Sequence, residues 1–222
     1  ANITGTGSMD VNAAQTVAGS ITQNAVDVAA VTLTHNTGDT YNVGTTTFSG
    51  AGTIAFDNAA RTITGNFTNT TDGQGILTVA GGTNTTAFVG NLGASVDNSL
   101  ASLTVGGVGS NIVTFSGNVY VDALVTTDAG DELRFVGASG STQVVSGSIN
   151  DDGADNAGII RVGNDTLTPT VRFDGIIGAT GDLATLEVNQ GATAFINAAA
   201  EFDTGVTVDT GATLRIGSGD TL

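Results

Sequence analysis

A run of carboxylate and amide side chains between residues 150 and 156 offers a dense set of oxygen ligands. Asp151, Asp152, Asp155 and Asn156 surround a glycine there, and Ca2+ takes about six to eight oxygen ligands in a flexible loop. An EF-hand calcium loop has a glutamate at its twelfth position. Here Gly163 and its neighbours occupy that region, so the EF-hand pattern is not met. These side chains are therefore candidates for calcium ligands, and a solvated turn is the alternative interpretation.

The basic side chains form a second set with potential chemistry. All five are arginines, and the chain has no lysine. Four of them stand between two apolar residues, and the alternation of a β-strand would place each guanidinium on the outer face. There the planar fork of an arginine can pair with a carboxylate or recognise an anionic glycan. The four are Arg134, Arg161, Arg172 and Arg215.

Side chains for catalysis are sparse. His35 is the only histidine and cysteine is absent, so a zinc site would need carboxylates for nearly all its ligands; we expect His35 to be structural or exposed. Hydrolysis of a polysaccharide needs a pair of carboxylates, and tryptophan, a common sugar platform, is absent. We therefore expect no enzyme, with a carbohydrate-active β-helix (hydrolase, lyase or tail-spike-like depolymerase) as the alternative. Its carboxylates would be Asp151 with Asp155, or Asp128 with Asp131 and Glu132.

The charge balance limits the partners of the chain. Its 222 residues include 21 acidic side chains against five arginines, for a formal net charge of -16. That charge repels the phosphates of nucleic acids and the anionic surface of a membrane. No apolar run reaches the length of about 18 residues that a membrane-spanning helix needs. We therefore expect neither nucleic-acid binding nor membrane insertion.

Short strands in repeated units would position these side chains. Residues 186–196 (LEVNQGATAFI) and 206–216 (VTVDTGATLRI) share one strand-turn-strand pattern at an offset of 20 residues. Residues 125–135 (VTTDAGDELRF) fit the same frame. Longer versions begin as LTVAGG at Leu77 and as LTVGG at Leu103, 26 residues apart, and each leads to a Gly-Asn pair. The chain therefore consists of imperfect repeats of about 20–26 residues, with glycine and Asx turns between strands.

Apolar residues alternate within each copy, so every strand buries a single face. Units this small cannot bury that face alone and must stack into a common core. The predicted fold is all-β, a parallel β-helix (β-solenoid) of roughly ten rungs and about 50 Å in length. Tandem β-sandwiches are the alternative, because regular turn signals suit them too. Residues 43–222 are expected as solenoid repeats, and residues 1–42 as an N-terminal cap or irregular β segment.

The segments LTVAGG…VGNL, LTVGG…FSGNV and VTVDTGATLRI resemble strand repeats of autotransporter passenger domains and of large repetitive surface antigens of Gram-negative bacteria. The resemblance covers residues 77–222 and extends more loosely over 43–76. It implies a secreted or surface-displayed right-handed β-helix used for adhesion, coating or spacing. It implies no catalytic residue.

These features predict a non-enzymatic extracellular β-solenoid on a bacterial surface, as a segment of an adhesin or as the subunit of a self-assembling filament or surface layer. Unpaired strand edges favour end-to-end self-association, and the outer faces would contact a host or cell-surface glycan or protein. A surface-layer module whose acidic faces are bridged by calcium is a further alternative. Calcium is the one cofactor that the sequence suggests.

Overall fold

The computed structural model describes residues 2–217, apart from 37–39, 58, 81, 108, 129, 153–157 and 165. All regular elements in the described residues are strands, and none is a helix. The strands are β1 (Ile3–Thr4), β2 (Ser8–Val11), β3 (Gln15–Ala18), β4 (Ile21–Val28), β5 (Thr32–Asn36), β6 (Tyr41–Phe48), β7 (Thr53–Phe56), β8 (Arg61–Asn69), β9 (Ile76–Ala80), β10 (Thr85–Val89), β11 (Leu100–Gly106), β12 (Ile112–Phe115), β13 (Val119–Thr126), β14 (Glu132–Phe135), β15 (Thr142–Asp151), β16 (Ile159–Val162), β17 (Thr170–Phe173), β18 (Leu183–Val188), β19 (Thr193–Ile196), β20 (Phe202–Val208) and β21 (Thr213–Ile216).

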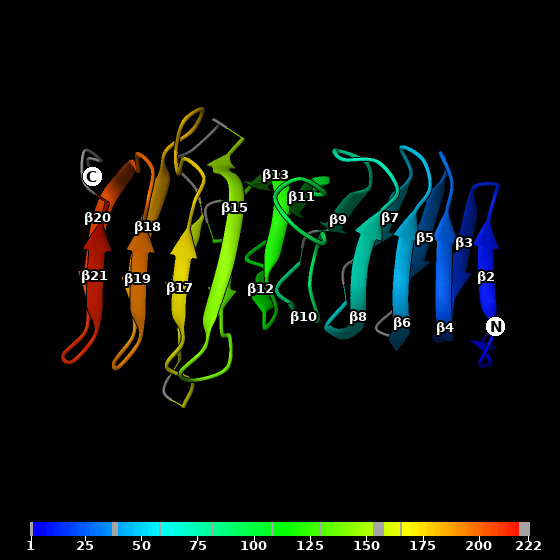
Figure 1. Ribbon diagram of the computed structural model, residues 1–222, viewed down its shortest axis with the longest axis horizontal. Coiled ribbons are helices and arrows are strands. Elements are labelled where there is room, and N and C mark those ends of the chain that lie inside the picture. The colour runs from blue at the N-terminus through cyan, green and yellow to red at the C-terminus, as the bar shows by residue number, and fades with distance from the viewer. Residues whose placement is uncertain are drawn as a thin grey trace.

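Strands of successive turns lie side by side along one axis, and the chain advances from one end of the molecule to the other (Figure 1). One sheet joins β1, β2 and the even-numbered strands from β4 to β20, and the other joins the odd-numbered strands from β3 to β21. The strand pairs are parallel, as in β4 on β6 or β17 on β19. The predicted β-solenoid, with about ten turns, is thereby confirmed. Tandem sandwiches are wrong, because their sheets are built from antiparallel pairs.

Equivalent positions of successive turns form columns across each sheet. Members of one inward column lie 20 to 27 residues apart, which agrees with the repeat length predicted from the sequence. Inward members are buried, apart from Val208 in the last turn, while their strand neighbours remain partly exposed. This column consists of Tyr41, Ile63, Phe88, Phe115, Phe135, Val162, Val188 and Val208.

Aromatic rings fill the core of the middle turns. The ring of Phe115 stacks between those of Phe88 and Phe135, with centroid distances of 5.8 and 5.2 Å. Tyr41 and Phe67 form a further stacked pair at 5.9 Å. Such ring pairs add about 0.5–1.5 kcal/mol each beyond the burial of their area. The core is therefore stabilised by contacts between turns as well as by the backbone ladders.

The Gly-Asn pairs of the repeats have a structural cause. Asn66 and Asn91 each accept, through Oδ1, a hydrogen bond from a backbone N–H of the next turn, at 2.9 and 2.8 Å. The preceding Gly90 has φ +133°, and a Cβ there would lie 2.3 Å from the carbonyl oxygen of Gly65. No other residue fits so close to a backbone, whereas the asparagine satisfies the next turn's amide.

The N-terminal segment joins the same stack. β1 and β2 pair in parallel with β4, and β3 pairs in parallel with β5. The stretch 1–42, expected as a cap or irregular β segment, thus contributes strands in register with those that follow. Inward and outward side chains alternate in this segment too, because Val11 and Val17 face the core.

Candidate binding surfaces

The predicted calcium ligands are only partly described by the structure. Asp151 ends β15 and is buried, in the inward column that places it beside Thr126 of the previous turn. Asp152 follows it and is exposed, while Asp155 and Asn156 lie outside the described residues. Within the described ranges, no group of three or more histidine or carboxylate side chains is placed to hold a metal ion. The calcium site remains a prediction from the sequence.

Two of the outward arginines form an ion-pair ladder with two glutamates. Arg134, Arg161 and Glu187 occupy one outward column on successive turns. Arg134 donates through Nη2 to Oε2 of Glu132 at 2.9 Å, and Oε1 of Glu132 lies 2.7 Å from Nε of Arg161 in an ion pair. Nη2 of Arg161 lies 2.8 Å from Oε2 of Glu187. Charges therefore balance within this ladder, and the hydrogen bond from Arg134 to Glu132 raises the pKa of Arg134.

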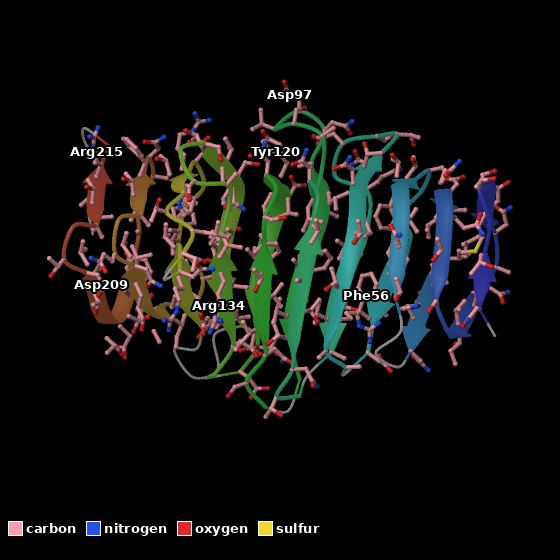
Figure 2. All side chains as sticks on the ribbon, turned by 90° about the horizontal axis from the view of Figure 1, so that it is seen from below. Phe56, Asp97, Tyr120, Arg134, Asp209 and Arg215 are labelled. Carbon is pink, nitrogen blue, oxygen red and sulfur yellow. The ribbon has the colours of Figure 1, made fainter. Side chains whose placement is uncertain are left out.

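The other two outward arginines share a column on the odd-numbered strands. This arginine–phenylalanine column consists of Val144, Arg172, Phe195 and Arg215. Arg172 donates to both carboxylate oxygens of Asp174 at 2.8–3.0 Å, which raises the pKa of Arg172. The guanidinium of Arg215 lies 5.0 Å from the centroid of the Phe195 ring. Figure 2 shows Arg215 at the outer surface near the C-terminal end of the solenoid, well away from Arg134.

The fifth arginine is buried in the core. Arg61 donates through Nη1 to Nδ1 of His35 at 2.8 Å and to the His35 carbonyl at 3.0 Å, and it forms an ion pair with Asp57. A guanidinium is only a donor, so Nδ1 of His35 is unprotonated and Nε2 donates to the carbonyl of Gly19 at 2.9 Å. His35 is thus the neutral Nε2–H tautomer, fully buried, and structural as expected. The alternation in Arg61-Thr62-Ile63 puts Arg61 on the same side of the strand as the apolar Ile63, and this pattern could have predicted the burial of Arg61.

The carboxylates proposed as a catalytic pair have separate structural partners. Asp131 is fully buried and accepts hydrogen bonds from the backbone and side chain of Asn111 at 2.9 and 3.0 Å, and from the backbone N–H of Thr127 at 3.3 Å. Burial raises the pKa of Asp131, although these hydrogen bonds oppose the shift. Glu132 next to it is held by arginines of the ladder. Asp131 thus stabilises a turn through its hydrogen bonds, and Glu132 links two neighbouring turns on the outer face through its arginines.

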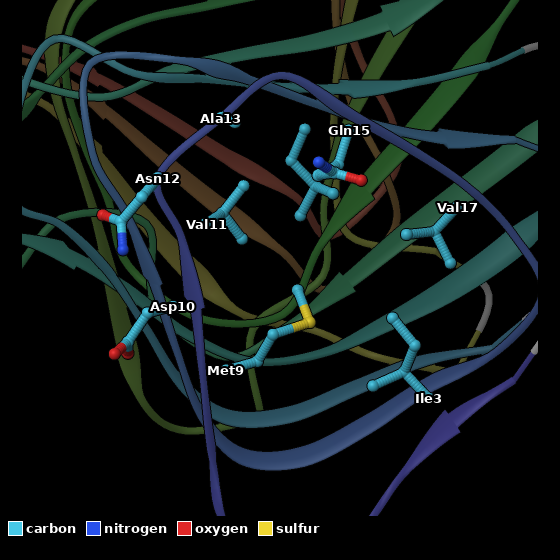
Figure 3. Close-up of a pocket in the computed structure, with 9 residues that line it drawn as sticks. Ile3, Met9, Asp10, Val11, Asn12, Ala13, Gln15 and Val17 are labelled. Atoms are coloured by element: carbon cyan, nitrogen blue, oxygen red, sulfur yellow. The ribbon is translucent and has the colours of Figure 1, made fainter.

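The apolar interior opens at the N-terminal end. A cavity of about 400 Å³ lies there, and Figure 3 shows Met9, Val11 and Val17 around it. A shallower hollow of about 540 Å³ lies on the outer side of the even-numbered strands and is lined mainly by small hydroxyl-bearing and methyl side chains. Its lining residues are Thr40, Asn42, Ala60, Arg61, Thr62, Thr64, Thr85 and Ala87.

Comparisons with known proteins give one partial match. The chain is 35% identical over 146 residues to the outer membrane protein A of Rickettsia rickettsii, an alignment that covers 64% of this chain and 6% of that protein. The chain therefore corresponds to a small part of that relative. No family model and no solved structure matches it. No membrane-spanning helix occurs in the part of the chain that the structure describes.

Proposed function

We propose that this chain is a stiff structural and adhesive segment of a bacterial surface protein, acting through its shape and outer faces rather than by catalysis. The observation that carries the proposal is the unbroken parallel stacking of turns from β1 to β21. The partial similarity to an outer membrane protein supports an extracellular, surface-displayed location. Repeat solenoids of this kind present extended surfaces for binding.

Stiffness follows from how neighbouring turns are joined. Each turn is bonded to the next through strands of both sheets, and rings such as Phe88, Phe115 and Phe135 stack along the axis. Bending the rod would open ladder hydrogen bonds on one side and separate rings on the other. A spacer that must hold an adhesive surface away from a cell needs this resistance to bending.

The adhesive part of the proposal is tested with the chain on fluorescent beads. We expect beads coated with the folded chain to bind cultured epithelial cells. Beads coated at equal density with a Leu103→Asp variant, which places a charge in the core and unfolds the turns, should not bind. Equal binding by the two sets of beads, or binding by neither, would contradict an adhesive role.

We propose in addition that copies of the chain associate end to end. Val208 and Ile216, inward positions of β20 and β21, are 42% and 41% exposed, whereas Val188 and Ile196 one turn earlier are 1% and 0% exposed. The cavity of Figure 3 leaves the interior open at the opposite end. A parallel turn of a second copy would cover such a surface and extend both sheets.

Sedimentation velocity over a concentration series tests this association. We expect the apparent mass to rise with concentration, and Val208→Lys to abolish the rise. The matched control is Val89→Lys, which puts the same charge at a residue that is 43% exposed in the middle of the rod. Association that survives Val208→Lys, or that Val89→Lys disrupts equally, would exclude the ends as the contact.

A further inference from the structure

The outer side of β15, β17, β19 and β21 carries two adjacent columns with complementary chemistry. One is the arginine–phenylalanine column described above. The other, the threonine column, consists of Thr142, Thr170, Thr193 and Thr213, each two residues before a member of the first. All eight side chains are exposed or half-buried. Because hydrogen-bonded parallel strands hold the columns, neighbouring members lie about 4.8 Å apart along the axis.

Arg215 differs from the other outward arginines in its electrostatic partner. Arg134, Arg161 and Arg172 each pair with a carboxylate. For Arg215, no carboxylate of the described residues lies within ion-pair distance, and its guanidinium rests over the Phe195 ring. The ring attracts the cation and limits its rotamers, which leaves the hydrogen-bonding edge of an ordered guanidinium open to a ligand.

Three chemical features converge on this surface. Arg215 offers a planar fork that fits a carboxylate. Phe195, which is half-buried, offers apolar ring surface against which the C–H groups of a pyranose can pack. The hydroxyls of Thr193 and Thr213 both donate and accept hydrogen bonds, as recognition of sugar hydroxyls requires.

We propose that the surface formed by the arginine–phenylalanine and threonine columns binds a glycan that ends in a carboxylated sugar. Arg215 holds the carboxylate, Phe195 packs against the sugar ring, and the threonine column bonds its hydroxyls. Arg172, which is paired with Asp174, lies beside Phe195 and borders the binding surface. This inference rests on the proposed adhesive function and names the ligand class that the adhesion would recognise.

The net charge of the chain decides which anionic ligand fits. A long polyanion would meet repulsion from the -16 net charge, whereas a single terminal carboxylate meets charges only within about 8 Å at physiological salt. Asp174, which follows Arg172 by two residues, has its charge neutralised by that arginine. The surface therefore selects a chain end with one acidic sugar over a polymer of acidic sugars.

An NMR titration of the full chain with matched disaccharides tests the proposal. One pair ends in glucuronic acid or in glucose, and a second pair ends in a sialic acid or lacks it. We expect shifts of the backbone amides of residues 193–197 and 213–217, with at least tenfold weaker binding of the neutral member of a pair. Binding of neither acidic probe, equal binding of both members of each pair, or shifts confined to another face would overturn the proposal.

Variants locate the contact. Arg215→Gln should reduce the affinity for the acidic probe to that for the neutral one, and Phe195→Thr should weaken both. Arg134→Gln is the matched control, since it removes an outward arginine already paired with Glu132, and it should leave both affinities unchanged. All three side chains lie on the outer faces, so unchanged circular dichroism spectra are expected. Full acidic-sugar binding by Arg215→Gln would refute the assignment.

The bead assay separates this inference from the function on which it rests. If wild-type and Arg215→Gln beads adhere to cells equally well, the adhesive function stands and the sugar site is wrong. If Arg215→Gln alone loses adhesion, and treatment of the cells with a sialidase or glucuronidase has the same effect on wild-type beads, both stand. If wild-type beads do not adhere, the adhesive function itself fails.

Discussion

Arginines occur in two opposite settings in this solenoid. Arg61 occupies an inward column that continues through Thr86, Val113 and Leu133 in the following turns, and its side chain is 0% exposed. Arg134 and Arg161 occupy an outward column, with side chains 34% and 29% exposed. The same residue type thus serves as a core residue near the N-terminal end and as a surface tie between later turns.

The difference shows that position in the column, rather than residue type, sets the energetic role. Burial removes water from the guanidinium of Arg61, so its contacts with His35 and Asp57 must offset the free-energy cost of burying the charge. Around Arg161 water remains a competitor, so each ion pair contributes little. Removing one partner should therefore be severe in the first setting and mild in the second.

The largest effect is expected for Arg61→Ala. The variant leaves Nδ1 of His35 and the carboxylate of Asp57 without their arginine and opens a cavity, and we expect a loss of about 3–5 kcal/mol in the free energy of unfolding. Urea denaturation followed by circular dichroism measures it. The double variant His35→Val with Arg61→Leu, which makes the inward positions apolar, should recover at least half of the loss. No recovery would show that the charge cluster is irreplaceable.

A slightly smaller effect is expected for Leu133→Ala in the same inward column. Leu133 is fully buried, and its truncation should cost about 3 kcal/mol through lost burial and a cavity. The same urea titration measures it at low and at high salt. This loss should not change with salt, because no charge is involved; a salt-dependent loss would mean that packing at this column is coupled to the ion-pair ladder.

Arg161→Gln should have a much smaller effect. It removes two ion pairs on a half-exposed face, and we expect a loss of about 0.5–1 kcal/mol that shrinks at 1 M NaCl, where the Debye length is about 3 Å. Leu133→Ala serves as the salt-insensitive reference. A loss as large as that of Arg61→Ala would remove the distinction between the two settings.

The smallest effect concerns the buried carboxyl of Asp131. Burial raises its pKa above the ordinary value of 3.8, so the folded state binds this proton more tightly than the unfolded state does. Its contribution to stability is therefore unfavourable above the folded-state pKa and is relieved as the pH falls from that pKa towards 3.8. The carboxyl 13C shift measured by NMR should titrate with a midpoint above 3.8. A midpoint at or below that value would show that the hydrogen bonds from Asn111 and Thr127 outweigh burial.

Much of the architecture could be predicted from particular residues. The matching segments 186–196 and 206–216 gave the repeat, and they form equivalent strands one turn apart. Alternation placed Arg134, Arg161, Arg172 and Arg215 outward, where the structure has them. Alternation alone could not say which of these arginines would find a carboxylate, because Glu132 meets Arg161 only through the stacking of turns whose lengths differ.

The sequence by itself determined the fold class, the repeat length and the side of the strand on which each side chain lies, because alternation and turn residues are local properties. Only the tertiary structure decided which side chains became neighbours: His35 with Arg61 in the core, two glutamates with Arg134 and Arg161, and Phe195 with Arg215 on the outer face. Apart from Glu132 and Arg134, which lie two residues apart in one strand, the members of each pair are 20 to 29 residues apart in the sequence. Because turns of different length keep the same columns, strand pairing rather than distance along the chain sets these neighbours, and the contacts belong to the assembled solenoid.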